Sequence, residues 1–176
     1  DLIAWPEMPA PLYIDRDRGL GDRLAQLARL ARAPVLATVV AHTPAGEPLN
    51  SAVLVSVRGQ IEDRYDKIQL VPFGEFVPPL FGWVNRVTNE TGDFAPGHRV
   101  VVFRAGGHGV GAFICYESAF PHLVREFARS GAEALVNLSN DGYFGRSAAR
   151  EQHLKLVRMR AIENRRWIVR STNDGI

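Results

Sequence analysis

Three residues of this sequence, a carboxylate, an amine and a thiol, each follow an apolar stretch and could share one reaction. They are Glu7, Lys67 and Cys115, and Cys115 is the only cysteine. A thiol nucleophile needs a base to take its proton, and a carboxylate can do this when burial raises its pKa. The tetrahedral intermediate then needs positive charge or N–H donors beside its oxyanion. Glu7, Lys67 and the backbone N–H after Cys115 meet these needs, which favours acyl transfer through a thioester.

Cys115 ends an apolar run, Val110 to Ile114, that reads as a buried strand. A helical pattern follows from about Ala119 to Arg129, so we expect the cysteine where a strand ends and a helix begins. Such junctions present reactive groups in α/β sheets, and a helix N-terminus or a cation nearby would favour the thiolate. The other interpretation is a buried structural cysteine, a common position for free cysteines.

Glu7 and Lys67 also have ordinary interpretations. Glu7 follows a short predicted strand, Leu2 to Trp5, and by itself reads as a solvated loop residue. A lysine after a strand is usually surface charge, but Lys67 is followed by the apolar residues Ile68, Leu70, Val71 and Phe73. A buried lysine needs a partner, and Glu75 could supply it from a loop that Pro72 and Gly74 restrict.

The remaining pattern alternates strands and helices, which predicts one α/β layered domain with mixed sheets over residues 1–176. Two hairpins are expected, with turns at Arg58-Gly59 and at Ala105-Gly-Gly-His108. Predicted helices cover Gly21–Arg32 and Arg150–Asn164. Predicted strands cover Val35–Ala41, Asn50–Val57, Ile61–Tyr65, Arg99–Arg104, Gly109–Ile114, Ala134–Leu138 and Trp167–Arg170.

A long irregular segment, 77–98, carries apolar residues that include Leu80, Phe81, Trp83 and Val84. Long loops within compact domains are often lids or binding loops, so this segment could contact an apolar substrate or a membrane surface. Equally, its apolar side chains could cap a satellite core.

Several other kinds of protein are not favoured. The net charge is +2 and, apart from a cluster at Arg158 to Arg170, the basic residues are scattered, so nucleic-acid binding is not predicted. No apolar run reaches the length of a membrane span, and no Walker loop, metal-ligand spacing or Ser/His/Asp pattern is present. His122 and His153 lie on predicted helices, where surface or packing positions are usual. A papain-like Cys/His pair stays open.

The stretches around these residues resemble the nitrilase superfamily, whose members use a Glu–Lys–Cys triad. Within it, they are most similar to the branch that acylates bacterial lipoproteins, chiefly through Leu70–Glu75 and Ser139–Gly145. The family loop commonly has Ala-Trp where this chain has Gly142-Tyr143. The matching stretches are Trp5–Glu7, Arg64–Pro78, Ile114–Glu117, Asn137–Gly145, Gln152–Glu163 and Arg170–Ile176.

The resemblance implies an α-β-β-α sandwich, and we expect this chain to be a partial catalytic domain cut at both ends, without the transmembrane helices of the family. It also implies roles for the site residues. Glu7 would be the general base, Lys67 the oxyanion stabiliser and Cys115 the nucleophile. Glu75, Tyr116 and Glu117 would support them: Glu75 would orient Lys67, Tyr116 would shape the site and offer its N–H, and Glu117 would hold the turn after Cys115.

The reaction that the resemblance implies needs no cofactor. Cys115 would take an acyl chain from a phospholipid and pass it to the α-amino group of a diacylglyceryl-modified apolipoprotein. The protein would act at the bacterial inner membrane, with this domain on the periplasmic side and the segment 77–98 as a lid near the bilayer. Two alternatives stay open: a soluble amidase or carbamoylase with the same triad, and a non-catalytic α/β binding domain.

Overall fold

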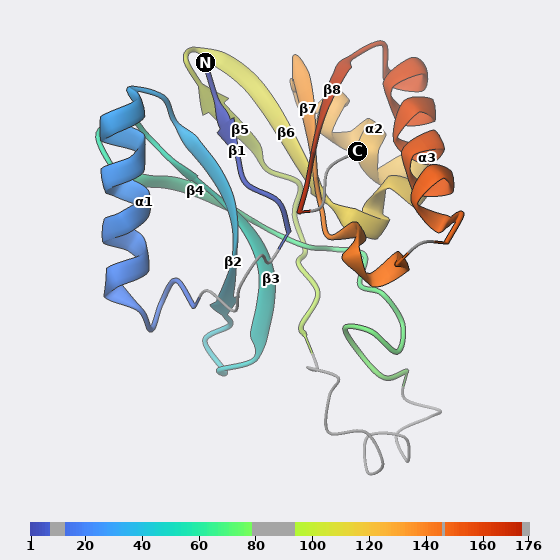
Figure 1. Ribbon diagram of the computed structural model, residues 1–176, viewed down its shortest axis with the longest axis horizontal. Helices are drawn as coiled ribbons and strands as arrows, with labels where there is room; N and C mark the ends of the chain where they lie inside the picture. Colours follow the sequence, from blue (N-terminus) through green and yellow to red (C-terminus); the bar gives the residue numbers. More distant parts are fainter. Residues whose placement is uncertain (8–12, 79–93, 146, 174–176) are drawn as a thin grey trace.

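The computed structural model describes residues 1–7, 13–78, 94–145 and 147–173 of the chain. Over these residues, eight strands form two four-stranded sheets that pack face to face, with three α-helices outside them (Figure 1). Helix α1 (Arg18–Ala31) covers one sheet, and α2 (Pro121–Arg129) and α3 (Ala149–Asn164) lie beyond the other. This layering confirms the predicted α-β-β-α sandwich.

The first sheet has the strand order β1 (Ile3–Ala4), β2 (Val35–His42), β3 (Pro48–Val55) and β4 (Ile61–Asp66). Strand β1 is parallel to β2, and the other neighbours are antiparallel. Successive side chains of β2 point to opposite sides of the sheet, and the side chains on both sides are buried. Val35, Ala37 and Val39 pack with α1, whereas Leu36 joins the larger core cluster.

The second sheet has the order β5 (Val102–Ala105), β6 (His108–Ile114), β7 (Ala134–Ser139) and β8 (Trp167–Thr172). Strands β5 and β6 form a hairpin, and β6, β7 and β8 are parallel, connected through α2 and α3. Parallel strands end at the same edge of a sheet, where α/β folds place their sites. Cys115 follows β6 at this edge, and Asn140 follows β7.

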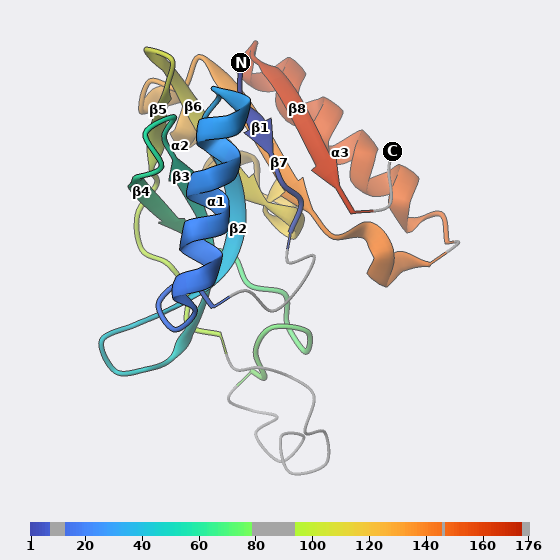
Figure 2. The same ribbon diagram turned by 60° about the vertical axis from the view of Figure 1, so that its left-hand side comes forward.

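The two sheets meet over the larger core cluster, which includes Leu36 and Tyr65 of the first sheet and Phe103 and Ile114 of the second. Strands β1 and β8, far apart in the sequence, also lie side by side (Figures 1 and 2), and the Ser171 hydroxyl donates to the Ala4 carbonyl at 3.0 Å. Strand β1 is therefore fixed against β8.

Element boundaries differ from the sequence expectations in a few places. A 3₁₀-helix, η3 (Cys115–Ala119), follows β6 at once, and α2 begins at Pro121 rather than near Ala119. Proline suits the first turn of a helix because its missing N–H would have no partner there. Helix α1 begins at Arg18, earlier than predicted, because Asp17 caps it by accepting from the Leu20 N–H.

Strand β5 begins at Val102, later than the predicted Arg99. The predicted lid residues Leu80, Phe81, Trp83 and Val84 lie outside the described residues, as do the last three positions of the chain. Within the described part of the chain, none of the helices has the length and apolar composition that crossing a bilayer requires.

Candidate active site

Lys67, directly after β4, lies in the interior between two carboxylates. Its Nζ is 3.1 Å from Glu7 Oε1 and 2.8 Å from Glu75 Oε1, and its side chain is 1% exposed. Burial acts to lower the pKa of Lys67, but the charges of Glu7 and Glu75 outweigh it and raise the pKa above its ordinary value. Lys67 is therefore an ammonium ion, and the sequence expectation that it needs Glu75 as a partner is confirmed.

Asn50 of β3 holds the same two carboxylates together. Its amide nitrogen donates to Glu7 Oε1 at 2.9 Å and to Glu75 Oε1 at 2.8 Å, the oxygens that also accept from Lys67. The side chain is fully buried, so both donors act without competition from water. No motif in the sequence singles out Asn50, because it is an ordinary member of a β-branched and apolar strand.

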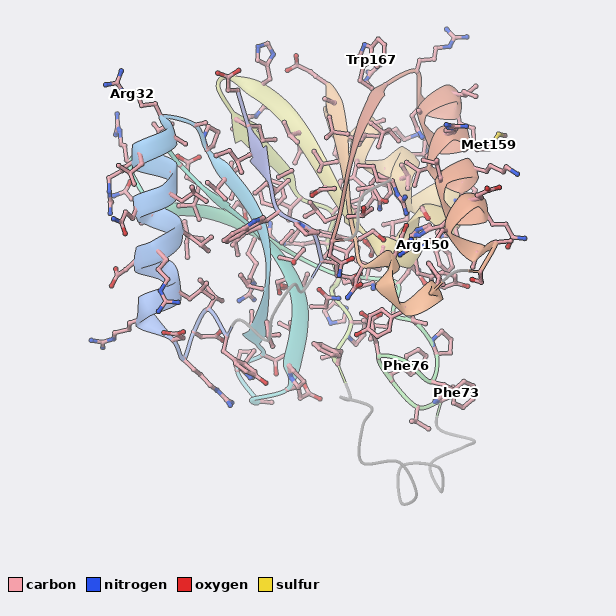
Figure 3. All side chains as sticks on the ribbon, viewed as in Figure 1. Arg32, Phe73, Phe76, Arg150, Met159 and Trp167 are labelled. Atoms are coloured by element: carbon pink, nitrogen blue, oxygen red, sulfur yellow. The ribbon has the colours of Figure 1, made fainter. Side chains whose placement is uncertain are left out.

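Glu75 belongs to a tight loop that its own side chain closes. Glu75 Oε2 accepts from the Val71 N–H at 2.8 Å, and the Phe73 N–H donates to the Phe76 carbonyl at 2.7 Å. Figure 3 shows Phe73 and Phe76 in this loop, with Phe73 half exposed at its tip. The loop thereby directs one carboxylate oxygen inward to Lys67 and presents an aromatic ring outward.

Glu7 connects the two sheets. The residue is 5% exposed, and its Oε2 accepts from the Asn140 N–H, after β7, at 3.0 Å. The preceding residue is fixed as well, because the Thr38 hydroxyl donates to the Pro6 carbonyl at 2.7 Å. The expectation of a solvated loop glutamate is therefore wrong: pairing of β1 with β2 carries Glu7 into the interior.

Cys115 is buried at the start of η3, with φ at 49° in the left-handed region. Burial and the neighbouring Glu7 carboxylate raise the pKa of the thiol to about 12, whereas Lys67 acts in the opposite direction. A nearby cation, Lys67, does favour the thiolate as expected, but burial and Glu7 outweigh it in the resting site. A thiol with this pKa has to lose its proton to a base during reaction, and the carboxylate beside it is Glu7.

Glu117 fixes the backbone around the cysteine from a fully buried position. Its Oε2 accepts from the Ile114 N–H at 2.7 Å, and its Oε1 accepts from the Tyr65 hydroxyl at 2.6 Å. The same Oε1 accepts from the N–H groups of Ile68 and Gln69, which follow Lys67. Glu117 therefore ties the turn at Cys115 to the segment that carries Lys67, as expected for a residue that holds this turn.

Tyr116, the remaining predicted supporting residue, has its side chain 40% exposed. Its ring packs edge-on against Phe120, with the centroids 5.3 Å apart. Its side chain thus lies at the outer side of η3, whereas its backbone directly follows Cys115.

His153 of α3, for which the helical pattern predicts a surface or packing position, is buried behind the cysteine. Its Nε2 lies 3.0 Å from the Cys115 carbonyl and its Nδ1 lies 3.0 Å from Asp141 Oδ1. The one sequence signal for His153 is that it lies in the stretch beginning at Gln152, which resembles the family. The contacts could not be found from spacing, because 38 residues separate His153 from Cys115.

With this geometry established, comparisons identify the family. The carbon-nitrogen hydrolase family model matches residues 1–176. The apolipoprotein N-acyltransferase of Geobacter metallireducens is 41% identical over 181 residues, covering 100% of this chain and 35% of the relative. That of Aquifex aeolicus is 32% identical over 177 residues, covering 99% of this chain and 39% of the relative. The chain thus spans between 35% and 39% of the length of these curated relatives.

Solved structures agree with the fold. A mutant of the Nesterenkonia AN1 amidase, from the nitrilase superfamily, superimposes with a TM-score of 0.73 at 20% identity, covering 97% of this chain and 62% of the amidase. The family model matches the whole of this chain, and this decides the assignment. The chain belongs to the carbon-nitrogen hydrolase family.

Proposed function

We propose that this chain is the catalytic domain of a bacterial apolipoprotein N-acyltransferase. The observation that carries the proposal is the cluster of Glu7, Lys67 and Glu75 beside a buried Cys115 thiol, in a chain 41% identical to such an acyltransferase. A phospholipid would be the acyl donor and a diacylglyceryl-modified lipoprotein the acceptor.

In the first half-reaction, Cys115 would attack the ester carbonyl carbon of the phospholipid. Glu7 takes the thiol proton as the Sγ–carbon bond forms, because a thiol with a pKa of about 12 is almost fully protonated at neutral pH. The ammonium of Lys67 and the N–H of Tyr116 stabilise the oxyanion. The carbon–oxygen ester bond then breaks, Glu7 returns the proton to the departing glycerol oxygen, and the acyl chain remains as a thioester.

In the second half-reaction, the α-amino group of the acceptor would attack the thioester carbonyl. Glu7 takes a proton from the amine, the carbon–sulfur bond breaks, and the proton returns to Cys115. The products are the amide-linked lipoprotein and the free thiol. Lys67 serves both steps without changing charge, since Glu7 and Glu75 together stabilise its protonated form.

The place of action is proposed from the relatives. Geobacter and Aquifex are bacteria, and an enzyme that joins a phospholipid to a lipoprotein has to work at a membrane. We place it at the inner membrane with this domain on the periplasmic side, and the segment 77–98 as the part that meets the bilayer. Phe73, half exposed at the tip of the Glu75 loop, fits an apolar mouth.

The test is to trap the acyl-enzyme. Full-length protein mixed with phospholipid and no acceptor should gain one acyl chain at Cys115, located by peptide mass spectrometry, and release it as acylated lipopeptide when acceptor is added. Cys115→Ala should abolish both, while Cys115→Ser separates nucleophilicity from packing. Transfer that persists in Cys115→Ala contradicts the proposal. Release of the acyl group to water alone would favour an amidase-like hydrolase.

A further inference from the structure

The backbone of Cys115 is held in an unfavourable conformation. A positive φ is uncommon and unfavourable for residues other than glycine, so it persists only where the surroundings enforce it. Glu117 holds the N-terminal side of this residue through the Ile114 N–H. The contacts that hold its carbonyl side come from a different part of the fold.

Helix α3 holds the carbonyl groups of η3 with two buried side chains. His153 Nε2 lies 3.0 Å from the Cys115 carbonyl, and Arg160 Nη1 donates to the Ser118 carbonyl at 3.3 Å. The two residues are two helical turns apart and so lie on one face of α3. A carbonyl oxygen can only accept, so Nε2 of the imidazole carries a hydrogen.

The imidazole is itself oriented by two charged groups. His153 Nδ1 lies 3.0 Å from Asp141 Oδ1 and 3.0 Å from Arg170 Nη2, and Arg170 also donates to Asp141 Oδ2. Burial acts to raise the pKa of Asp141, but hydrogen bonds from Ser139 and Arg170 outweigh it and the pKa is lowered. Asp141 is therefore a carboxylate between η4 (Asp141–Phe144), β8 and α3.

These contacts close a ring that starts and ends at the cysteine. The Cys115 thiol lies beside Ser139, whose hydroxyl donates to Asp141 Oδ1 at 2.8 Å. Asp141 contacts His153, and His153 donates to the Cys115 carbonyl. These contacts thus restrain both the side chain and the backbone of the nucleophile. They are separate from the contacts of Glu7 and Lys67, which act on the thiol itself.

We infer that His153 and Asp141 are positioning residues for the nucleophile, and that they set the rate of thioester formation without contacting the acyl chain. The inference rests on the proposed role of Cys115. A displacement of about 1 Å at a reacting group costs on the order of 100-fold in rate, so releasing the Cys115 carbonyl should slow attack by about 10–100-fold. Binding of the phospholipid should be almost unaffected.

The test compares His153→Leu, which removes the donor, with His153→Gln, which can return an N–H to the Cys115 carbonyl. The full-length protein is mixed with phospholipid, and the single-turnover rate and half-saturating concentration of thioester formation at Cys115 are measured. His153→Leu should lose about 10–100-fold in rate with about a 2-fold change at most in half-saturation. His153→Gln should recover most of the loss. Lys155→Gln, exposed on the same helix, should match the wild type.

The inference is overturned if His153→Leu forms the thioester at the wild-type rate, if the loss lies in half-saturation alone, or if His153→Gln is as slow as His153→Leu at equal melting temperature. If His153→Leu does not fold, the comparison is made between His153→Gln and Asp141→Asn. The inference then requires His153→Gln to form the thioester faster than Asp141→Asn. A wild-type protein that forms no thioester at Cys115 would instead refute the proposed function.

Discussion

Replacing Glu7 by glutamine should make the Cys115 thiol easier to ionise and should nevertheless lower acyl transfer. Burial raises the pKa of this thiol most, and the Glu7 carboxylate is the next cause. Glutamine keeps the shape but removes the charge, and removal of a nearby negative charge favours the thiolate, so the pKa should fall. Because the same change removes the base, acyl transfer should also fall.

The pKa of the Cys115 thiol sets the size of the expected change in its ionised fraction. With a pKa of about 12, the thiolate fraction at pH 7 is on the order of 10⁻⁵. A neighbouring charge typically shifts a pKa by about 1–3 units, so Glu7→Gln should raise that fraction about 10–1000-fold. Loss of a positioned general base costs about 10²–10⁴-fold in rate. The variant should therefore be more ionised and yet far less active.

The ionisation is measured from the pH dependence of iodoacetamide labelling at Cys115, quantified by peptide mass spectrometry in the full-length protein. Acyl transfer is measured with phospholipid and a lipopeptide acceptor. Glu62→Gln, an exposed carboxylate on β4, is the matched control and should change neither property. A Glu7→Gln variant whose thiol titrates as in the wild type would refute the electrostatic argument, and one that keeps full transfer would refute the assignment of the base.

Other positions give further expectations. Asn50→Leu removes two hydrogen bonds to buried carboxylates, which should cost about 2–4 kcal/mol in the free energy of unfolding, measured with urea. Asp141 has a lowered pKa in the folded state, so its stabilisation is present above its ordinary pKa of 3.8 and is lost as the pH falls through the folded value; Asp141→Asn should therefore differ most from the wild type near neutral pH and least in acid. Gly97→Ala would place a Cβ 2.0 Å from the Asp66 carbonyl oxygen and should destabilise by about 1–3 kcal/mol. Gly21→Ala in α1, where the Cβ meets nothing within 4 Å, should stabilise by about 0.5–1 kcal/mol.

Each expectation has a contrary result. Asn50→Leu at wild-type stability would mean that the two carboxylates do not need this bridge. A difference between Asp141→Asn and the wild type that grows in acid would reverse the sign of the linkage. Equal melting temperatures for Gly97→Ala and Gly21→Ala would show that the segment beside β4 can move away without cost.

Much of the fold could be predicted because strands and helices have characteristic apolar patterns over short stretches of sequence. The β-branched run at Val35 and the amphipathic pattern after Gly21 each correspond to an element of the structure, and both predicted hairpins are present. The apolar pattern does not give the ends of the elements, because capping residues and prolines set them. Asp17 starts α1 earlier than the apolar pattern indicates, and Pro121 separates η3 from α2.

The reacting residues of the site could be predicted from the sequence, but the buried residues that hold them could not. Cys115 and Lys67 stand out by residue type and by their place after strands. Glu75 stands out as an acid in a restricted loop eight residues after Lys67, within reach of it. Asn50 and His153 do not stand out. An asparagine in a buried strand and a histidine on a helix carry no signal of their contacts, which span 43 and 38 residues.

Local patterns in the sequence predict which residue types stand at the ends of which strands, because periodicity and turn residues act over a few positions along the chain. Packing of the layers sets three further properties: the thiol is protonated at rest, Glu7 is buried, and contacts through Ser139, Asp141 and His153 return to the Cys115 backbone. These properties depend on desolvation and on distances between the two sheets and α3. Such distances arise when the layers pack together, and no local pattern encodes them.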